Sequence, residues 1–129
     1  MLAMFFPEVQ FHLVDSIGKK LKVVEAVSAA LEISNVTIQH SRAEDIKGRK
    51  FDFAVSRAVA PLGELWKWSR PLLRKERKME DLKNGLICLK GGDLTEEIAA
   101  STTRPHQQPI GDLFDEPFFE EKFILYVPL

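Results

Sequence analysis

The sequence has little cysteine, no long hydrophobic run and no surplus of one charge. Its single cysteine, Cys88, excludes a disulfide framework, and the apolar residues around it predict a buried free thiol in a reducing cytosol. The apolar run at residues 1–6 is too short to span a membrane, and it lacks the basic start and cleavage site of a signal peptide. The formal net charge of −1 excludes nucleic-acid binding by bulk electrostatics, so such binding needs a local patch. We therefore expect a cytoplasmic protein without a membrane span.

The sequence also lacks clustered metal ligands. His12, His40 and His106 are scattered and show no metal-ligand spacing, so we predict no metal site. The 129 residues are enough for one domain with a core, since 45% of them are hydrophobic.

Hydrophobic patterning predicts strands that alternate with helices. Strands are expected at residues 9–14, 36–39, 51–56, 86–89 and 123–127. The helix after the first strand carries a periodic apolar face that should pack on a sheet, formed by Ile17, Leu21, Val24, Val27 and Leu31. A helix starting near Pro61 should be interrupted at Pro71, and residues 101–109 should form a surface loop. This order predicts an α/β, Rossmann-like parallel sheet whose last strand can be antiparallel.

The most informative stretch runs from Leu13 to Lys20, where an apolar strand ends on Asp15 and a short turn leads into a helix. In doubly wound α/β domains, an acid at this point holds the ribose hydroxyls of an adenosine-containing cofactor. Two structural alternatives stay open: Asp15 could cap the helix that follows, and the Ser16 hydroxyl could do the same.

A glycine-rich loop is missing upstream of this acid. Such an acid normally lies about 20 residues beyond a glycine-rich loop, but only fourteen residues precede Asp15 and none of them is glycine. We expect the chain to begin inside the first helix of a larger domain, so that residues 1–129 form a single incomplete domain.

Four motifs occur in a characteristic order: residues 13–20 (LVDSIGKK), 41–44 (SRAE), 51–58 (FDFAVSRA) and 89–91 (LKG). In this order and spacing the chain resembles the glucose-inhibited division protein B family, the small-subunit ribosomal RNA methyltransferases G. The likeness runs from about Phe6 to Lys90 and is weaker to the end of the chain.

The resemblance implies the class I methyltransferase fold and S-adenosyl-L-methionine as cofactor. It implies methylation of nitrogen 7 of a guanine in 16S rRNA, with the small ribosomal subunit as partner. Asp15 and Ser16 would hold the cofactor's ribose, and Ala43 and Glu44 its adenine. Arg57 would lie at the floor of the cofactor site, and Arg57 and Lys90 are the candidates to orient the guanine. Taken alone, Glu44 could be a solvated acid, and Arg57 could merely pair with Asp52 or Glu44.

The chain departs from this family in lacking the first strand and its glycine-rich loop. The resemblance places that strand between the strands expected at 9–14 and 51–56, so its absence leaves unpaired backbone groups inside a sheet. The flanking strands could pair directly, another chain could fill the gap, or the region could be loose. We expect this chain alone to bind cofactor poorly and to be inactive.

Two other functions are compatible with the pattern. A non-catalytic Rossmann-like interaction module could self-associate through the open sheet edge and form an oligomer. The chain could also be half of a nucleotide-dependent dehydrogenase, but the absence of a G-x-G-x-x-G motif argues against this function.

Overall fold

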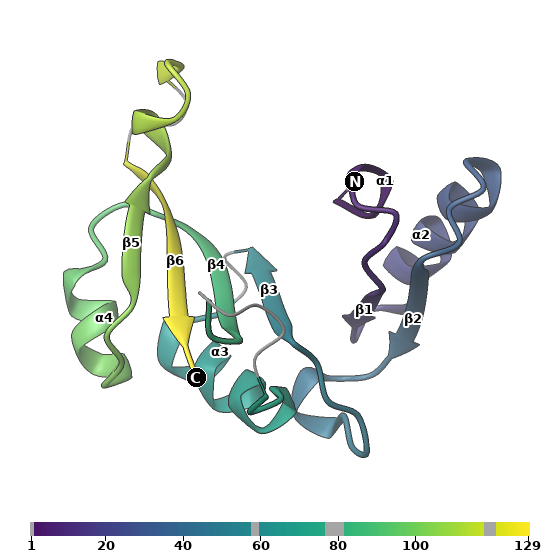
Figure 1. Cartoon of the computed structure of the whole chain (residues 1–129), viewed down its shortest axis with the longest axis horizontal. Coiled ribbons are helices and arrows are strands. Elements are labelled where there is room, and N and C mark those ends of the chain that lie inside the picture. Colours follow the sequence, from purple (N-terminus) through teal and green to yellow (C-terminus); the bar gives the residue numbers. More distant parts are fainter. Residues whose placement is uncertain (1, 58–59, 77–81, 118–120) are drawn as a thin grey trace. The chain divides into compact units, whose positions relative to one another are not determined.

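Figure 1 shows the computed structural model of the chain, which describes residues 2–57, 60–76, 82–117 and 121–129. The chain divides into two compact units, Met1–Ile46 and Lys47–Leu129. Each unit contains its own sheet, and the two units are described one after the other.

The first unit is a strand–helix–strand arrangement preceded by one short helix. Its elements are α1 (Leu2–Phe5), β1 (Phe11–Asp15), α2 (Gly18–Ala30), β2 (Val36–His40) and the 3₁₀ turn η1 (Ala43–Asp45). β1 and β2 are parallel, and their register runs from Phe11 opposite Val36 to Asp15 opposite His40. Both strands were predicted, with boundaries shifted by at most two residues.

Asn35 ties the N-terminal segment to the start of β2. Its side-chain amide donates to the carbonyls of Ala3 (3.1 Å), Phe6 (3.1 Å) and Val9 (2.8 Å), and only 6% of the residue is exposed. Its backbone carbonyl accepts from the N–H of Phe11 at 2.8 Å. The segment before β1 is therefore held by hydrogen bonds, although most of its large apolar side chains are exposed.

The predicted buried face of α2 is wrong at three of its five positions. Leu21 is buried and Val24 is half-buried, but Ile17, Val27 and Leu31 are 48%, 49% and 54% exposed. Ile17 precedes the helix and Leu31 follows it, so neither continues the helical spacing. The sheet of this unit, as far as residues 2–46 describe it, also has two strands, which cover a narrow strip of the helix.

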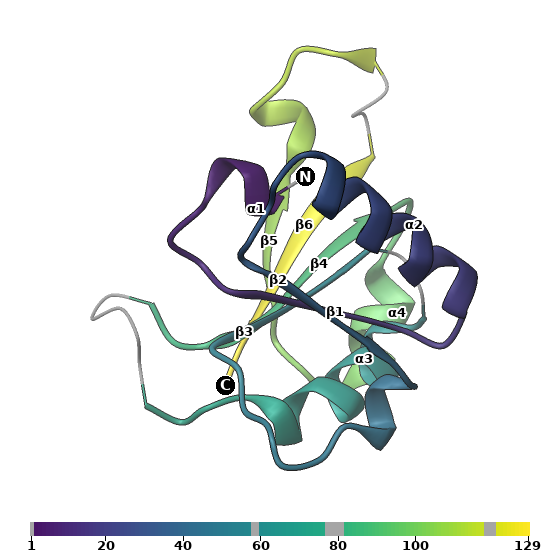
Figure 2. The same ribbon diagram turned by 90° about the vertical axis from the view of Figure 1, so that its right-hand side faces the viewer.

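The second unit is a four-stranded mixed sheet. Its strands are β3 (Phe53–Arg57), β4 (Gly85–Gly91), β5 (His106–Pro109) and β6 (Lys122–Pro128), and its helices are α3 (Leu62–Ser69) and α4 (Thr95–Ser101), with 3₁₀ turns η2 (Arg70–Leu72) and η3 (Ile110–Asp112). The strand order is β3-β4-β6-β5, and both views show β6 between β4 and β5 (Figures 1 and 2). β3 and β4 are parallel, whereas β6 is antiparallel to both of its neighbours, as the sequence allowed for the last strand.

The core of this unit combines alternate residues of β4 and β6 with the apolar faces of α3 and α4. Its buried members are Leu62, Leu65, Leu86, Cys88, Leu94, Leu125 and Val127. α3 begins directly after Pro61 and passes into a 3₁₀ turn that contains Pro71, as predicted. Cys88 is confirmed as a buried free cysteine, and burial raises the pKa of its thiol to about 11.

The expected surface loop at residues 101–109 is wrong in its second half, because His106–Pro109 forms β5. This segment has no apolar alternation, since it is an edge strand that is mostly exposed. It is held by pairing with β6, and the His106 ring stacks on Tyr126 with ring centres 5.6 Å apart.

The described strands form two sheets, whereas a doubly wound fold has one continuous sheet. Within the described residues β1 pairs with β2 alone and β3 pairs with β4 alone. Direct pairing of the strands that flank the gap, in different units, stays a prediction. Each of these strands keeps one edge that no described strand covers.

Candidate functional site

Asp15 shapes the turn that joins β1 to α2. Its Oδ1 accepts a hydrogen bond from the N–H of Ile17 at 2.8 Å, and Lys20 Nζ lies 3.9 Å from its Oδ2. About a third of the side chain is exposed. The start of α2 has no side-chain cap, so the alternative that Asp15 caps the helix is wrong. A carboxylate offers about four lone-pair positions, so Asp15 both braces the turn before α2 and keeps the capacity to accept further hydrogen bonds.

Ser16 does not cap α2, which corrects the sequence-based alternative. The helix start has no side-chain cap, and the exposed Ser16 contributes its backbone carbonyl, which accepts from His40 Nε2 at 3.0 Å. A Cβ atom at Gly18 would lie 3.2 Å from His40 Cε1, so the imidazole packs directly on this turn. His40 was not identified from the sequence, although its place at the carboxyl end of a predicted strand could have drawn attention to it.

The structure brings two of the sequence motifs to one edge of the first unit. Because β1 and β2 are parallel, their carboxyl ends lie together, and the N–H of Ser41 donates to the carbonyl of Asp15 at 3.1 Å. Just beyond, η1 carries Ala43, which is half-buried, and Glu44, which is exposed. This edge therefore presents one partly exposed carboxylate and one exposed carboxylate, beside a half-buried small residue.

Arg57 ends β3 in the second unit, opposite Leu89 of β4, and its side chain is exposed. The proposed structural pairing with Asp52 is not found, since the Asp52 carboxylate lies 3.6 Å from Arg74 Nη1. The planar guanidinium at this carboxyl edge matches the geometry of a carboxylate or phosphate. Ala58, which closes the third motif, lies outside the described residues.

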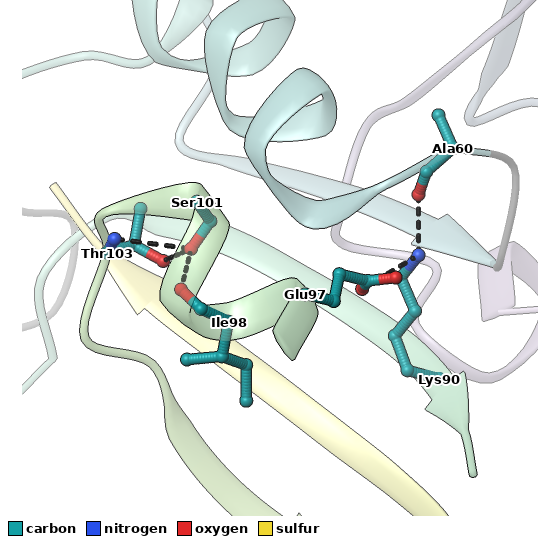
Figure 3. Close-up of polar contacts among 6 residues, drawn as sticks. All are labelled: Ala60, Lys90, Glu97, Ile98, Ser101 and Thr103. Atoms are coloured by element: carbon teal, nitrogen blue, oxygen red, sulfur yellow. Dashed lines mark hydrogen bonds and ion pairs between the residues drawn. The ribbon is translucent and has the colours of Figure 1, made fainter. Parts of the chain in front are cut away.

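Lys90 lies on the covered side of β4, as Figure 3 shows. Only 8% of the residue is exposed, and its Nζ donates to the carbonyl of Ala60 at 2.5 Å. Glu97 Oε2 lies 3.3 Å from the same nitrogen, close enough for an ion pair but without hydrogen-bond alignment. The ammonium group that the sequence suggested for the guanine is thus enclosed among β4, α4 and the segment that leads into α3.

Two other features bear on the kind of site. Among the described residues, no group of three or more His, Cys, Asp or Glu side chains is arranged to hold a metal ion. No helix in the described part of the chain has the length and apolarity needed to cross a membrane.

Comparison with known proteins gives a consistent result. The family model described as "GidB: rRNA small subunit methyltransferase G" matches residues 1–114. Curated relatives named "Ribosomal RNA small subunit methyltransferase G" include those of Porphyromonas gingivalis and Parabacteroides distasonis, each 51% identical over 128 residues. A relative of the same name from Flavobacterium psychrophilum is 47% identical. These alignments cover 99% of this chain but 58%, 55% and 60% of the respective relatives, so the chain spans between half and two thirds of their length.

Among solved structures, the chain resembles one described as "Structure of a putative methyltransferase from Thermoplasma acidophilum", with a TM-score of 0.58. The match covers 92% of this chain and 56% of that one at 12% sequence identity, which establishes likeness of fold. The prediction of a Rossmann-like methyltransferase fold is thereby confirmed.

Proposed function

The chain belongs to the rRNA small subunit methyltransferase G family, and from this premise we propose that the protein transfers a methyl group from S-adenosyl-L-methionine to nitrogen 7 of a guanine in 16S rRNA. Its partner is the small ribosomal subunit, and this substrate implies a cytoplasmic location. The family match and the names of the relatives support the reaction class. The alternative of a non-catalytic interaction module is not favoured by any comparison.

In this proposal the carboxyl edge of the first unit holds the adenosine half of the cofactor. The observation that carries it is the hydrogen bond from Ser41 to the Asp15 carbonyl, which ties the two motifs together at one edge. Asp15 accepts from the ribose hydroxyls with the lone pairs that Ile17 leaves free, and Ser16 lies beside it. Ala43 and Glu44 flank the adenine. These residues suit an adenosine group, since they combine an accessible carboxylate with a small, partly covered side chain.

Methylation of guanine nitrogen 7 makes modest demands on protein side chains. The bound cofactor supplies an electrophilic methyl group on a positively charged sulfur. Nitrogen 7 has a free lone pair and no proton to lose, so no general base is required. The protein has to hold the nitrogen in line with the methyl group, and orientation alone can supply a large part of a rate enhancement.

Arg57 is the candidate to orient the base. Its guanidinium is exposed at the carboxyl end of β3 and carries several N–H donors in a fixed fork. Because nitrogen 7 must stay free to react, Arg57 would donate to the guanine carbonyl oxygen or to an RNA phosphate. Lys90 was the second candidate, and its burial leads to a different role, which is proposed below.

We further propose that the two units are parts of one methyltransferase domain and that residues 1–129 alone bind cofactor weakly and lack activity. The uncovered edges of β1 and β3 support this, because a ligand held at the carboxyl edge of a sheet needs neighbouring strands fixed in register. Self-association of the chain through an open edge remains a prediction.

The test is methyl transfer by the protein purified from its native source, with small ribosomal subunits and labelled cofactor. Mapping of the label should give one guanine methylated at nitrogen 7, and Asp15→Ala should lower transfer at least tenfold through a raised cofactor KM. Asp112→Ala removes an exposed carboxylate in η3 and serves as the matched control. Label in protein, in another base or at another atom of guanine would refute the proposed reaction.

A further inference from the structure

Lys90 is a charged side chain in a place where charge is costly. Among the described residues it is the only charged one that is more than nine-tenths buried. A buried ammonium loses its hydration, and this is tolerated only when the group is paired and hydrogen-bonded. An apolar side chain would fill the same position beside Leu86 and Cys88, so the presence of lysine points to a specific task.

The Lys90 side chain joins three separate elements (Figure 3). It extends from β4, donates to the carbonyl of Ala60 just before α3, and pairs with Glu97 of α4. The two helices are themselves closely packed, because a Cβ atom at Gly63 would lie 3.2 Å from the Cα of Ser101. Ser101 also fixes the end of α4, since its Oγ donates to the carbonyl of Ile98 at 2.6 Å. Lys90 therefore connects the segment at Ala60 to a rigid frame.

The Ala60 carbonyl is a natural point at which to hold this segment. Pro61 follows it and has no N–H to donate, so the chain at the entry to α3 cannot be anchored through that residue's backbone nitrogen. Ala60 also lies three residues after Arg57. In the register of β3 and β4, Arg57 lies opposite Leu89, the residue directly before Lys90.

We propose that Lys90 is a positioning residue: it holds the Ala60 carbonyl at the entry to α3 and, from the position next to Leu89, the register partner of Arg57, it sets how Arg57 is presented at the carboxyl edge. The consequence for catalysis rests on the function proposed for Arg57. The placement of Arg57 by Lys90 does not rest on that function, because it concerns contacts within the second unit. Glu97 balances the charge of Lys90, while the hydrogen bond to Ala60 does the positioning.

The experiment separates positioning from simple stabilisation with paired substitutions in the 129-residue chain. Lys90→Met leaves the buried Oε2 of the partly exposed Glu97 without its partner and should lower the melting temperature. The double variant Lys90→Met with Glu97→Met replaces the ion pair by two apolar side chains and should recover most of that loss. Lys83→Met removes an exposed lysine of the same unit and is the matched control.

The readouts are the Arg57 Nε–Hε resonance and the carbonyl carbon resonance of Ala60. Both should shift in Lys90→Met and stay shifted in the double variant, although its melting temperature recovers. Lys90→Arg, which can still donate to Ala60, should bring both resonances back toward their original positions. Unchanged resonances in the double variant would mean that Lys90 only stabilises the fold, and the proposal would be overturned.

A measurement on the unsubstituted chain protects the test against variants that do not fold. The Lys90 ammonium should give a slowly exchanging ¹⁵N resonance with a nuclear Overhauser effect to Ala60, whereas a fast-exchanging ammonium would refute the contact. No ligand is present in any of these measurements. A failure of the cofactor site would therefore leave them unchanged and would appear only in the methyl-transfer assay.

Discussion

At the scale of single residues, Asp15 has a structural role and a proposed functional role, and substitutions can separate the two. Asp15 both braces the turn before α2 and offers a carboxylate to solvent, so its removal has two effects. The sequence predicted the position of Asp15 because the strand pattern before it is unambiguous. It could not predict that neither Ser16 nor Asp15 caps α2, since hydroxyl and carboxylate are both good caps and only the backbone geometry decides whether they reach the helix N–H groups.

Substitutions at this turn should separate the two roles. Asp15→Ala should lower the free energy of unfolding of the first unit by about 1 kcal/mol, because the N–H of Ile17 loses the hydrogen bond that it makes in the turn. Asp15→Asn keeps an acceptor oxygen and should cost much less. Ser16→Ala should have almost no effect, since the hydroxyl does not cap the helix. Urea titration followed by amide resonances of residues 11–40 measures all three, and a large loss in Ser16→Ala would contradict this assignment.

Cys88 gives a pH prediction with a defined sign. Burial raises the pKa of its thiol from 9.0 to about 11, so the unfolded chain releases this proton at lower pH than the folded chain. The contribution of the protonated thiol to the free energy of unfolding is complete below pH 9 and is lost as the pH rises toward 11. Unfolding free energies measured across this range should fall, and Cys88→Ala should remove the part of the slope that belongs to the thiol. An equal slope in both proteins would argue against a buried, protonated Cys88.

At the scale of elements, the apolar pattern of the sequence predicted the strands that bury their side chains. The strands around Val14, Ile38, Leu86 and Leu125 were found where expected, because buried strands are marked by apolar runs. β5 was missed, since an edge strand made of His, Gln and Pro is held by backbone pairing that leaves no apolar signature. The burial of the apolar face of α2 was overestimated, because the spacing of apolar residues does not reveal the width of the sheet that the helix packs on.

Asn35 should control the order of the segment that precedes β1. Asn35→Asp replaces the donating amide by an oxygen that faces the carbonyls of Ala3, Phe6 and Val9. Loss of these buried hydrogen bonds should lower the free energy of unfolding by about 1–3 kcal/mol. Hydrogen exchange at the Phe11 amide, which donates to the Asn35 carbonyl, should accelerate, whereas the exposed substitution Ser34→Ala should leave it unchanged. Unaltered exchange in Asn35→Asp would show that this anchor is dispensable.

At the scale of the whole molecule, the division into two units follows from strand pairing. Among the residues that the structure describes, the first unit has two strands and the second has four, with β4 and β6 paired on both edges. The sequence predicted a gap at this place from the resemblance and from the absent glycine-rich loop. It could not predict how the gap is closed, because direct pairing of the flanking strands and a strand from another chain would satisfy the same backbone groups.

The units should differ in stability. A two-stranded sheet is marginal by itself, whereas the larger sheet of the second unit has a compact apolar core between its strands and α3 and α4. Amide resonances of residues 11–40 should therefore disappear at a lower urea concentration than those of β4 and β6. A single coincident transition for both sets would show that the two units unfold as one.

The most direct test of the account is a titration of the ¹⁵N-labelled chain with S-adenosylhomocysteine, the cofactor product. The account predicts weak binding whose chemical-shift changes in the first unit centre on Asp15, Ser16, Ala43 and Glu44, with loss of these changes in Asp15→Ala and not in Asp112→Ala. Absence of any change at this edge, or a response centred elsewhere in the first unit, would contradict the claim that the joined carboxyl ends of β1 and β2 form the cofactor site.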